Sequence, residues 1–362
     1  MKSVFSPVRI GDYDLANAIV MAPLTRARAG GEGIPNNLMA EYYRQRATAG
    51  MIITEATAIN RQGHGWPGGP GIYTPEQIAG WKKVTAAVHR ENGIVFSQLF
   101  HMGRVVLPDY ADGQHPISAS AVTATGEMPG PDGTPQAFQQ PREMDMTDIE
   151  AATHDFARAA ENAIHAGFDG AEIHAANNFL IDSFLRDGTN QRHDQYGGNA
   201  ENRARFLIEI VEKTIAAIGA GRTGVRISPS NNVFGITDSN AEQTFTTVAR
   251  LLNPYDLAYL HILEPEAKSG HPMATDGPDT APAIRSVYKG KIILNGGFDL
   301  AKANGAINAG LGDAVAFGVP FISNPDLVER FQNHYPLTNA GPETFYTPGA
   351  AGYTDYPTHQ SA

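Results

Sequence analysis

Apolar, strand-like segments alternate with helical segments eight times along this chain, and this alternation constrains the fold more than any other feature. The eight strand candidates are Ile19–Thr25, Met51–Ile59, Ile94–Phe100, Phe168–Ala175, Gly224–Pro229, Leu257–Leu263, Lys291–Gly296 and Asp313–Phe317. Continuous apolar runs of this kind suit parallel strands that are covered on both faces. Eight β–α units in one chain predict an α/β fold of the (β/α)8 TIM-barrel type rather than a doubly wound sheet.

The segments between these strands carry helix start and stop signals. Residues 74–77 (TPEQ) and 147–150 (TDIE) each predict a capping box, and residues 324–326 (NPD) are expected to begin the helix after the last strand. A left-handed C-cap is predicted at Gly93, Gly167 and Gly310, which each follow a helical run.

We expect residues 1–362 to form a single domain with one large insertion. Residues 105–142 are rich in Gly, Pro, Gln and Asp and separate the third strand from its helix. Such an excursion is typical of an active-site lid, although a plain surface hairpin explains it equally well. Beyond residue 336, Tyr353 and Tyr356 predict a tail that docks against the barrel.

Composition excludes several classes of function. The chain has no Cys, which excludes disulfides, thiolate nucleophiles, iron–sulfur clusters and Cys-ligated zinc. A net charge of -11 argues against nucleic acid and anionic membranes as partners. Neither a signal peptide nor a membrane span is apparent, so a soluble cytoplasmic protein is expected, and monomer and homodimer both stay open.

The stretch Asp169–Leu180 (DGAEIHAANNFL) carries the strongest functional signal. It begins as a strand, ends as a helix, and presents His174, Asn177 and Phe179 at the junction. A His and an Asn at this spacing can jointly donate hydrogen bonds to one oxygen atom, as an oxyanion-stabilising pair does. The ring of Phe179 has no hydroxyl, so it can stack on a substrate but cannot protonate one.

In a (β/α)8 barrel the reactive groups lie at the C-terminal ends of the strands. The residues at those ends are Pro23, Thr25, Ala56, Gln98, His174, Arg226, Gly296, Gly297 and Gly318. They offer hydrogen-bonding groups rather than paired carboxylates or metal ligands, so we predict no metal site. Thr25, Gln98 and Arg226 suit a planar heterocycle with carbonyl and ring-nitrogen groups. Glycines after strands seven and eight suit a phosphate. A flat polar ring with one phosphate describes flavin mononucleotide (FMN).

Motifs along nearly the whole chain resemble the Old Yellow Enzyme family of FMN-dependent ene-reductases. The resemblance rests on the runs MAPLTRAR, AEYYRQRATAG, EAT, QLFHMGR, AEIHAANNFLIDSFLRDGTNQRHDQYGG, ENRARF, VRISPS, AFG, NPDL and GYTDYP. The run from Ala171 to Gly198 is strongly specific, whereas VRISP or NPDL alone is weak. Thr25 stands where one subgroup has Cys, so the chain is similar to the subgroup named for the yeast enzymes.

The resemblance implies a role for each matching residue. Thr25 would bond the flavin C4 carbonyl and tune its reduction potential, and Gln98 and Arg226 would contact the pyrimidine edge. Backbone contacts would come from Pro23 and Ala56. His174 and Asn177 would clamp the carbonyl or nitro oxygen of an electron-poor alkene stacked over FMN, and NADPH or NADH would supply hydride in a ping-pong cycle.

Two positions depart from the family pattern. Phe179 stands where relatives have the Tyr that protonates the α-carbon. Val319 stands where many relatives have an Arg, so backbone N–H groups near Gly297, Gly318 and Val319 are left to bind the FMN phosphate. We therefore expect maleimides, quinones and nitro compounds to be reduced more readily than weakly activated enones, and FMN to be held more weakly.

Other residues allow plainer interpretations. His64, His89, His101, His115, His193 and His271 lack a motif and are assigned to the surface or to loops. Residues 219–224 match GxGxxG, but they follow a helix and precede a strand, so we predict a turn. Glu172 is expected to be a buried partner of a lumen cation such as Arg226. Trp66, Phe100 and Tyr346 are expected to wall the substrate pocket.

Two alternative functions remain open. The missing Tyr would permit a flavin-dependent isomerase or disproportionation catalyst, which product analysis with and without NADPH would separate from a reductase. A phosphate-binding barrel lyase without flavin belongs to another class, and a colourless purified protein would favour it.

Overall fold

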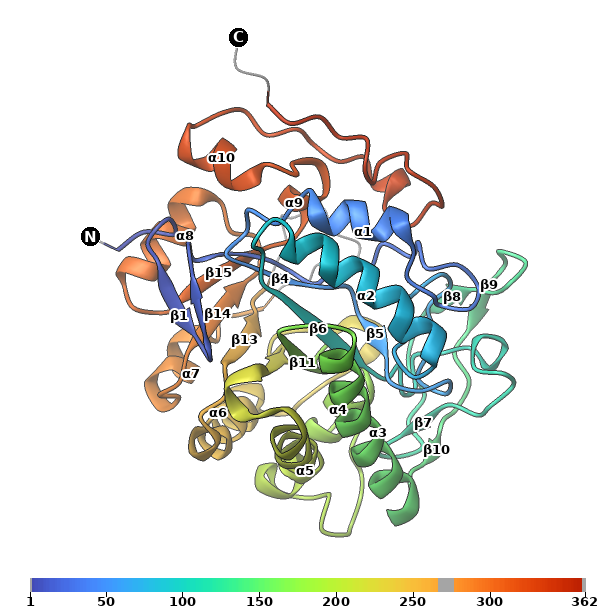
Figure 1. The fold of residues 1–362 in the computed structure, drawn as a ribbon. Helices are drawn as coiled ribbons and strands as arrows, with labels where there is room; N and C mark the ends of the chain where they lie inside the picture. The colour runs from blue at the N-terminus through green and yellow to red at the C-terminus, as the bar shows by residue number, and fades with distance from the viewer. Residues whose placement is uncertain (1, 266–276, 360–362) are drawn as a thin grey trace.

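Eight parallel strands close into a barrel (Figure 1). The computed structural model describes residues 2–265 and 277–359. Around the barrel the strands run in the order β3 (Ile19–Met21), β4 (Met51–Ile53), β6 (Val95–Phe100), β11 (Gly170–Ala175), β12 (Thr223–Ile227), β13 (Tyr259–Leu263), β14 (Ile292–Asn295) and β15 (Ala314–Phe317). Pairing of β15 with β3 and of β6 with β11 completes the closure. The predicted barrel is confirmed, with each strand shorter than its apolar run.

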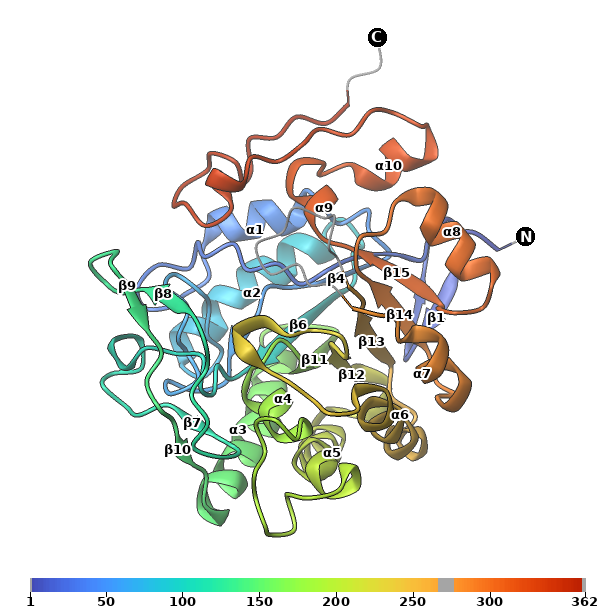
Figure 2. The same cartoon turned by 180° about the vertical axis from the view of Figure 1, so that it is seen from behind.

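Helices surround this barrel on its outer face (Figures 1 and 2). They are α1 (Asn37–Arg44), α2 (Pro75–His89), α3 (Met146–His165), α4 (Leu180–Leu185), α5 (Ala200–Ile218), α6 (Ala241–Leu252), α7 (Ala281–Val287), α8 (Leu300–Asn308), α9 (Val319–Ser323) and α10 (Leu327–Gln332). The helices α4 and α9 are short additions that directly follow β11 and β15. Both additions therefore lie near the end of the barrel where the functional groups were predicted.

Of the three predicted helix starts, one is confirmed and two are shifted by a few residues. Thr74 caps α2 in a reciprocal capping box with Gln77, as predicted. The second box is wrong by two residues, because Asp145 is the N-cap of α3 and Asp148 is its partner. Thr147 therefore lies inside the first turn. Helix α10 begins at Leu327 rather than at the Asn-Pro-Asp segment, with Asp326 as its N-cap.

Of the three predicted glycine C-caps, two adopt the left-handed conformation. Gly167 has φ 90° and Gly310 has φ 72°. At the end of α2 the left-handed residue is Asn92 (φ 58°), one position before Gly93. Asn tolerates this conformation better than other non-glycine residues, which explains why the turn did not need the glycine.

The barrel interior is closed at the N-terminal ends of the strands by a hairpin of β1 (Val8–Ile10) and β2 (Tyr13–Leu15). Ile10 and Leu15 are buried with the inward side chains of the barrel in one apolar cluster. The Tyr13 hydroxyl donates to the carbonyl oxygen of Asp169 at 2.6 Å, which ties the hairpin to the chain before β11. The opposite end of the barrel is left for the functional groups.

The insertion between β6 and α3 forms small sheets of its own. Strands β8 (Glu127–Pro129) and β9 (Pro135–Ala137) make an antiparallel hairpin, and β7 (Ile117–Ser118) pairs with β10 (Arg142–Glu143). Figures 1 and 2 place this hairpin on the opposite side of the barrel from the β1–β2 hairpin. A short β5 (Thr57–Ala58) also pairs with β6. The insertion is therefore a hairpin that also backs the pocket, as described below.

The segment after α10 runs back across the outside of α1, as Figure 1 shows in red. Tyr353 is fully buried, and its ring stacks on Tyr42 with centroids 4.0 Å apart. The predicted docking of the tail is therefore confirmed at Tyr353, whereas Tyr356 is only partly buried.

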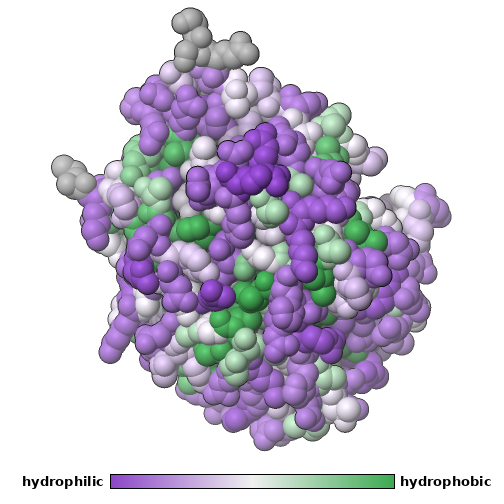
Figure 3. All heavy atoms as spheres, in the orientation of Figure 1, coloured by the Kyte–Doolittle hydropathy of each residue, from purple (hydrophilic) through white to green (hydrophobic). Residues whose placement is uncertain are grey.

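Polar side chains cover most of the face in Figure 3, and apolar ones are scattered between them in small patches. In residues 2–265 and 277–359, no helix combines the length and apolar character that crossing a bilayer requires. We also find no cluster of three His, Asp or Glu side chains placed to bind a metal ion in these ranges.

Candidate active site

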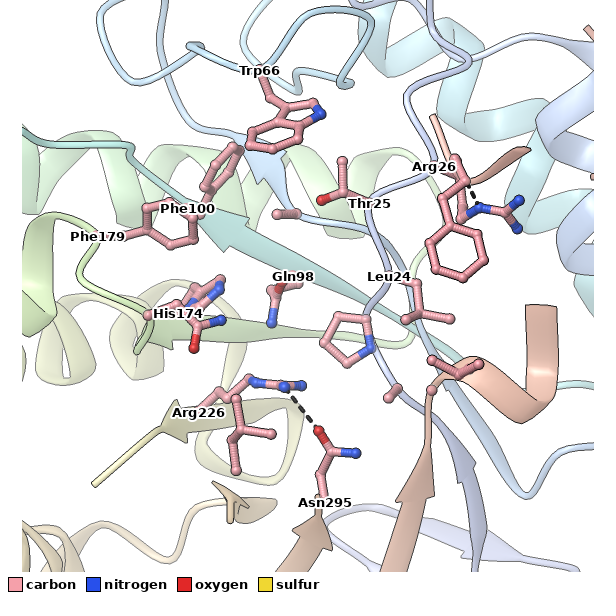
Figure 4. A pocket seen from close by; sticks show the side chains of 18 of the residues that line it. Leu24, Thr25, Arg26, Trp66, Gln98, Phe100, His174, Phe179, Arg226 and Asn295 are labelled. Atoms are coloured by element: carbon pink, nitrogen blue, oxygen red, sulfur yellow. Dashed lines mark hydrogen bonds between the residues drawn. The ribbon is translucent and has the colours of Figure 1, made fainter. Parts of the chain in front are cut away.

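A deep cavity opens at the C-terminal ends of the barrel strands. Figure 4 shows the side chains that face it. Predicted residues that border it are Pro23, Thr25, Ala56, Trp66, Gln98, Phe100, His174, Asn177, Phe179, Arg226, Gly318, Val319 and Tyr346. Gly296 and Gly297, which follow β14, do not border it, although both have positive φ. One cavity therefore brings together nearly all of the predicted side chains.

His174 reaches the cavity from β11, where it pairs in register with Arg226 on β12. The side chain is 4% exposed, and its Nδ1 atom has no hydrogen-bond partner in the described part of the chain. Burial, and then the charge of Arg226, lowers the pKa of His174 well below 6.5. His174 is therefore a neutral imidazole with hydrogen-bonding capacity left for a bound molecule.

The amide of Asn177 is held in one orientation by its neighbours. Asn177 and Asn178 both have positive φ (59° and 65°), and the N–H of Asn177 donates to Ser228 Oγ at 2.9 Å. Asn231 donates from Nδ2 to Asn177 Oδ1 at 2.8 Å, while its own Oδ1 accepts from the N–H of Val233. Because the amide oxygen of Asn177 is already occupied, its NH2 group is the donor that remains.

A buried ion pair supports the two left-handed asparagines. Asp182 on α4 accepts the N–H of Asn178 at 2.9 Å and pairs with Arg186 at 2.9 Å. Arg186 in turn donates to the carbonyl oxygen of Ser228. The polar groups below Asn177 are thus satisfied by one another, which explains how the chain sustains two consecutive residues in an uncommon backbone conformation.

Aromatic rings form the other side of the cavity. Phe179 lies edge-on to His174 at 5.0 Å and to Phe100 at 5.4 Å between ring centroids. The insertion backs these rings with an apolar cluster that includes Val105, Val106 and Leu107. Trp66 lies 5.6 Å from Tyr346, which is 39% exposed, at the rim. We call Phe100, Phe179, Trp66 and Tyr346 the aromatic wall.

Gln98, Arg226 and Asn295 line the cavity side by side (Figure 4), and we call this part of the cavity its floor. Arg226 donates to Asn295 Oδ1 at 2.9 Å. The predicted burial of Glu172 is confirmed, but the predicted partner is wrong: Glu172 accepts hydrogen bonds from Gln98 at 2.7 Å and His261 at 2.8 Å rather than pairing with Arg226. Burial raises the pKa of Glu172, but the hydrogen bonds from His261 and Gln98 and the charge of Arg226 bring it below its ordinary value.

The loop that carries Thr25 is fixed by a second buried carboxylate. Glu55 accepts the backbone N–H groups of Arg26 and Ala27, each at 3.1 Å. The guanidinium of Arg26 donates to the carbonyl oxygens of Phe345 and Gly352 at 3.1 and 2.7 Å. Arg26 therefore links the loop next to the cavity to the C-terminal segment that supplies Tyr346.

Several residues that line the cavity were missed from the sequence: Ala22, Leu24, Arg26, Asn231, Leu263, Glu264, Asn295, Ile322 and Phe345. Asn295 could have been found, because it comes directly before the glycine that ends the predicted strand Lys291–Gly296 and shares its inward parity with Ile293. No sequence signal indicates Asn231, which reaches the cavity from an irregular loop after β12.

Two histidines that were assigned to the surface or loops are in fact buried. His64 lies in a loop, but its ring is enclosed between the Tyr73 hydroxyl and the carbonyl oxygen of Gly69. His101 follows β6 directly, and burial lowers its pKa to about 3. The sequence around these two histidines does not indicate that other segments of the chain cover them. His271 lies outside the described residues. The 219–224 segment is a short 3-10 turn, as predicted.

This arrangement can do two things chemically. Gln98, Arg226, Asn295 and Thr25 offer donors and acceptors to a flat polar ring. His174 and Asn177 offer neutral donors to an oxygen atom of a second molecule above that ring. The ring of Phe179 offers neither a proton nor a hydrogen bond.

Comparisons with known proteins agree with this site. A family model described as the NADH:flavin oxidoreductase / NADH oxidase family matches residues 3–338. 12-Oxophytodienoate reductase 7 of Oryza sativa subsp. japonica is 41% identical over 371 residues, which cover 98% of this chain and 94% of that protein. The structure of the Old Yellow Enzyme homologue from Zymomonas mobilis has 45% identity and a TM-score of 0.95, covering 98% of this chain and 99% of that one. Morphinone reductase in complex with tetrahydroNAD has 41% identity and a TM-score of 0.93, with 99% and 98% covered.

Proposed function

Because the chain belongs to the Old Yellow Enzyme family of FMN-dependent NADH:flavin oxidoreductases, we propose that it reduces activated carbon–carbon double bonds of small molecules. NADH or NADPH would be the reductant, in line with the nicotinamide analogue bound by morphinone reductase. Bound FMN would supply the hydride-transfer chemistry between the nicotinamide and the β-carbon of the alkene. We propose enones, enals, maleimides, quinones and nitro compounds as the substrate classes.

The observation that carries this proposal is the pair of neutral donors beside a polar floor. Neither ring nitrogen of His174 has a hydrogen-bond partner in the described part of the chain, and Asn177 keeps its NH2 group free of the Asn231 contact. Both lie in the same cavity as Gln98 and Arg226. Donors aimed at one carbonyl or nitro oxygen withdraw electron density from the conjugated double bond and make its β-carbon electrophilic.

The floor suits the isoalloxazine ring of FMN. Thr25 would donate to a ring carbonyl, and Pro23 and Ala56 would contact the ring through their backbone. Gln98 would bond the pyrimidine edge, and the guanidinium of Arg226 would stabilise negative charge that develops there. Gly318 and Val319, which border the cavity, would supply backbone N–H groups to the phosphate.

The substrate would lie between this ring and the aromatic wall. Its oxygen would accept hydrogen bonds from His174 and Asn177, and its apolar part would contact Phe100, Trp66 and Tyr346. Phe179 has no proton to give, so water would protonate the α-carbon. Alkenes that are already strongly polarised depend least on that proton, which favours maleimides, quinones and nitro compounds over simple enones.

Spectra and turnover test the proposal. The purified protein should be yellow, and anaerobic addition of NADPH or NADH should bleach its visible flavin band. A maleimide should then restore the colour and yield the saturated product. A protein that stays colourless after FMN is added would overturn the proposal. Alkene consumption that proceeds without nicotinamide would instead favour an isomerase or disproportionation catalyst.

A further inference from the structure

Two fully buried ionisable residues, Glu172 and His261, lie below the floor of the cavity. Glu172 on β11 pairs in register with Gln98 on β6, and His261 on β13 pairs with Arg226 on β12. These four side chains therefore project from four adjacent strands of the barrel. Neither Glu172 nor His261 borders the cavity, so neither can touch a bound molecule there.

The four side chains form one continuous chain of hydrogen bonds. Gln98 Nε2 donates to Glu172 Oε1 at 2.7 Å, and His261 Nδ1 lies 2.8 Å from Glu172 Oε2. Arg226 Nη1 donates to His261 Nε2 at 3.4 Å. Arg226 continues to Asn295 Oδ1 at 2.9 Å, and Asn295 Nδ2 ends the chain at the carbonyl oxygen of Ala316, 2.9 Å away.

The direction of every bond in this chain is determined. A guanidinium can only donate, so His261 must accept through Nε2 and carry its proton on Nδ1. That proton points to Glu172, which also accepts from Gln98. The lowered pKa of Glu172 makes it an ionised carboxylate, which accepts at both oxygens.

The charged and titratable neighbours agree with this assignment. Burial, and then the charge of Arg226, lowers the pKa of His261, so the ring is neutral. Burial and the charge of Glu172 raise the pKa of Tyr259 well above 10, so Tyr259 is a neutral phenol. His174, whose pKa is lowered by burial, is also neutral.

We propose that Glu172 and His261 are positioning residues that set the hydrogen-bond polarity of the cavity floor. Because Glu172 engages the Gln98 amide nitrogen, Gln98 presents its amide oxygen to the cavity, next to the N–H groups of Arg226. An acceptor beside a donor recognises an uncharged ring edge with an N–H next to a carbonyl. This proposal rests on the proposed function, in which the pyrimidine edge of FMN has that pattern.

An isosteric change at Glu172 would break the pattern. In Glu172→Gln, one oxygen acceptor becomes an NH2 donor. If this NH2 faces Gln98, Gln98 must turn its own NH2 toward the cavity. If it faces His261, the proton of His261 must move to Nε2, where it meets an N–H of Arg226. The first orientation reverses the polarity offered to the ligand, and the second leaves one buried donor facing another.

FMN affinity measured by fluorescence titration of the apoprotein tests this. Glu172→Gln should bind FMN about 10- to 100-fold more weakly than the parent. Glu209→Gln is a matched control, since Glu209 on α5 accepts from the Tyr196 hydroxyl far from the cavity. Equal affinity of Glu172→Gln and the parent would overturn the inference. A parent that binds no FMN would instead contradict the proposed function.

A swap variant separates polarity from a general structural role. In the double variant Gln98→Glu with Glu172→Gln, the introduced amide can donate to the introduced carboxylate and accept from His261, so every bond again joins a donor to an acceptor. The double variant should regain at least about tenfold in FMN affinity over Glu172→Gln. A double variant that binds no better than the single one would overturn the inference.

The tautomer of His261 gives a test that does not depend on FMN binding. Histidine side-chain 15N chemical shifts of the apoprotein, assigned with His261→Asn, should show a neutral ring protonated on Nδ1. A ring protonated on Nε2, or on both nitrogens at neutral pH, would overturn the inference.

Discussion

The two sides of the active-site cavity are built by different means. On one side, Asn177, Gln98 and Arg226 are each held by polar neighbours, such as Asn231 beside Asn177 and Glu172 below Gln98. On the other side, the ring of Phe179 packs against aromatic rings and apolar side chains. The buried hydrogen bonds of this site therefore orient the side chains that, under the proposed function, contact the FMN ring and the substrate oxygen. The aromatic ring at position 179 supplies no acid where the product needs a proton.

Restoring a hydroxyl on the aromatic wall should have the largest effect. Phe179→Tyr is expected to accelerate the reduction of weakly activated enones by about 10²- to 10⁴-fold, because a positioned general acid replaces water. Turnover of maleimides should change little. Steady-state rates for both substrate classes measure this, with Phe100→Tyr as a control that adds a hydroxyl to the neighbouring ring. No gain on the weak enones would show that protonation does not limit the parent.

Removing a donor from the polar side should cost somewhat less. We expect His174→Ala to lower kcat/KM for maleimides by about 10²- to 10³-fold, the usual loss for one oxyanion donor. His165→Ala, at the end of α3 outside the cavity, serves as the control. A loss below about threefold would mean that His174 does not hold the substrate oxygen.

A second apolar position, Val319, tests how the cavity binds the FMN phosphate. Val319→Arg should tighten FMN binding by about 1.5–3 kcal/mol, because a charge-assisted bond to the phosphate joins the backbone contacts. Apoprotein titration with FMN and with riboflavin measures this, since riboflavin lacks the phosphate and should gain nothing. Equal gains for both ligands would place the effect elsewhere.

His101, next to the aromatic wall, gives the smallest expected effect. Its folded pKa of about 3 lies below the ordinary value of 6.5, so the unfolded chain binds more protons between these values. The stability from the neutral ring is present above pH 6.5 and is lost as the pH falls toward 3. Through His101, the parent should lose about 2 kcal/mol of its free energy of unfolding between pH 7 and pH 5. His101→Asn keeps an acceptor for the N–H of Gly103 and should not show this part of the loss. Urea unfolding at both pH values measures this, and an unchanged loss would contradict a buried neutral His101.

The barrel could be predicted because each of its strands is a separate apolar run, and the capping box at Thr74 marked α2 correctly. Side chains at strand ends, such as Gln98 and Arg226, followed from the position of active sites in such barrels. Asn231 could not be predicted, because its position depends on the path of an irregular loop. The burial of His64 and His101 depends on segments distant in sequence that fold over them.

The attachment of the C-terminal segment has a consequence for synthesis of the protein. Phe345 and Tyr346 complete the rim of the cavity, and Arg26 near the N-terminus holds the carbonyl oxygens of Phe345 and Gly352. These residues follow all eight barrel strands in the chain, and ribosomes deliver the chain from its N-terminus. A nascent chain can therefore form its barrel while the cavity is still open on one side, and that side closes only after residues 345–352 have been synthesised.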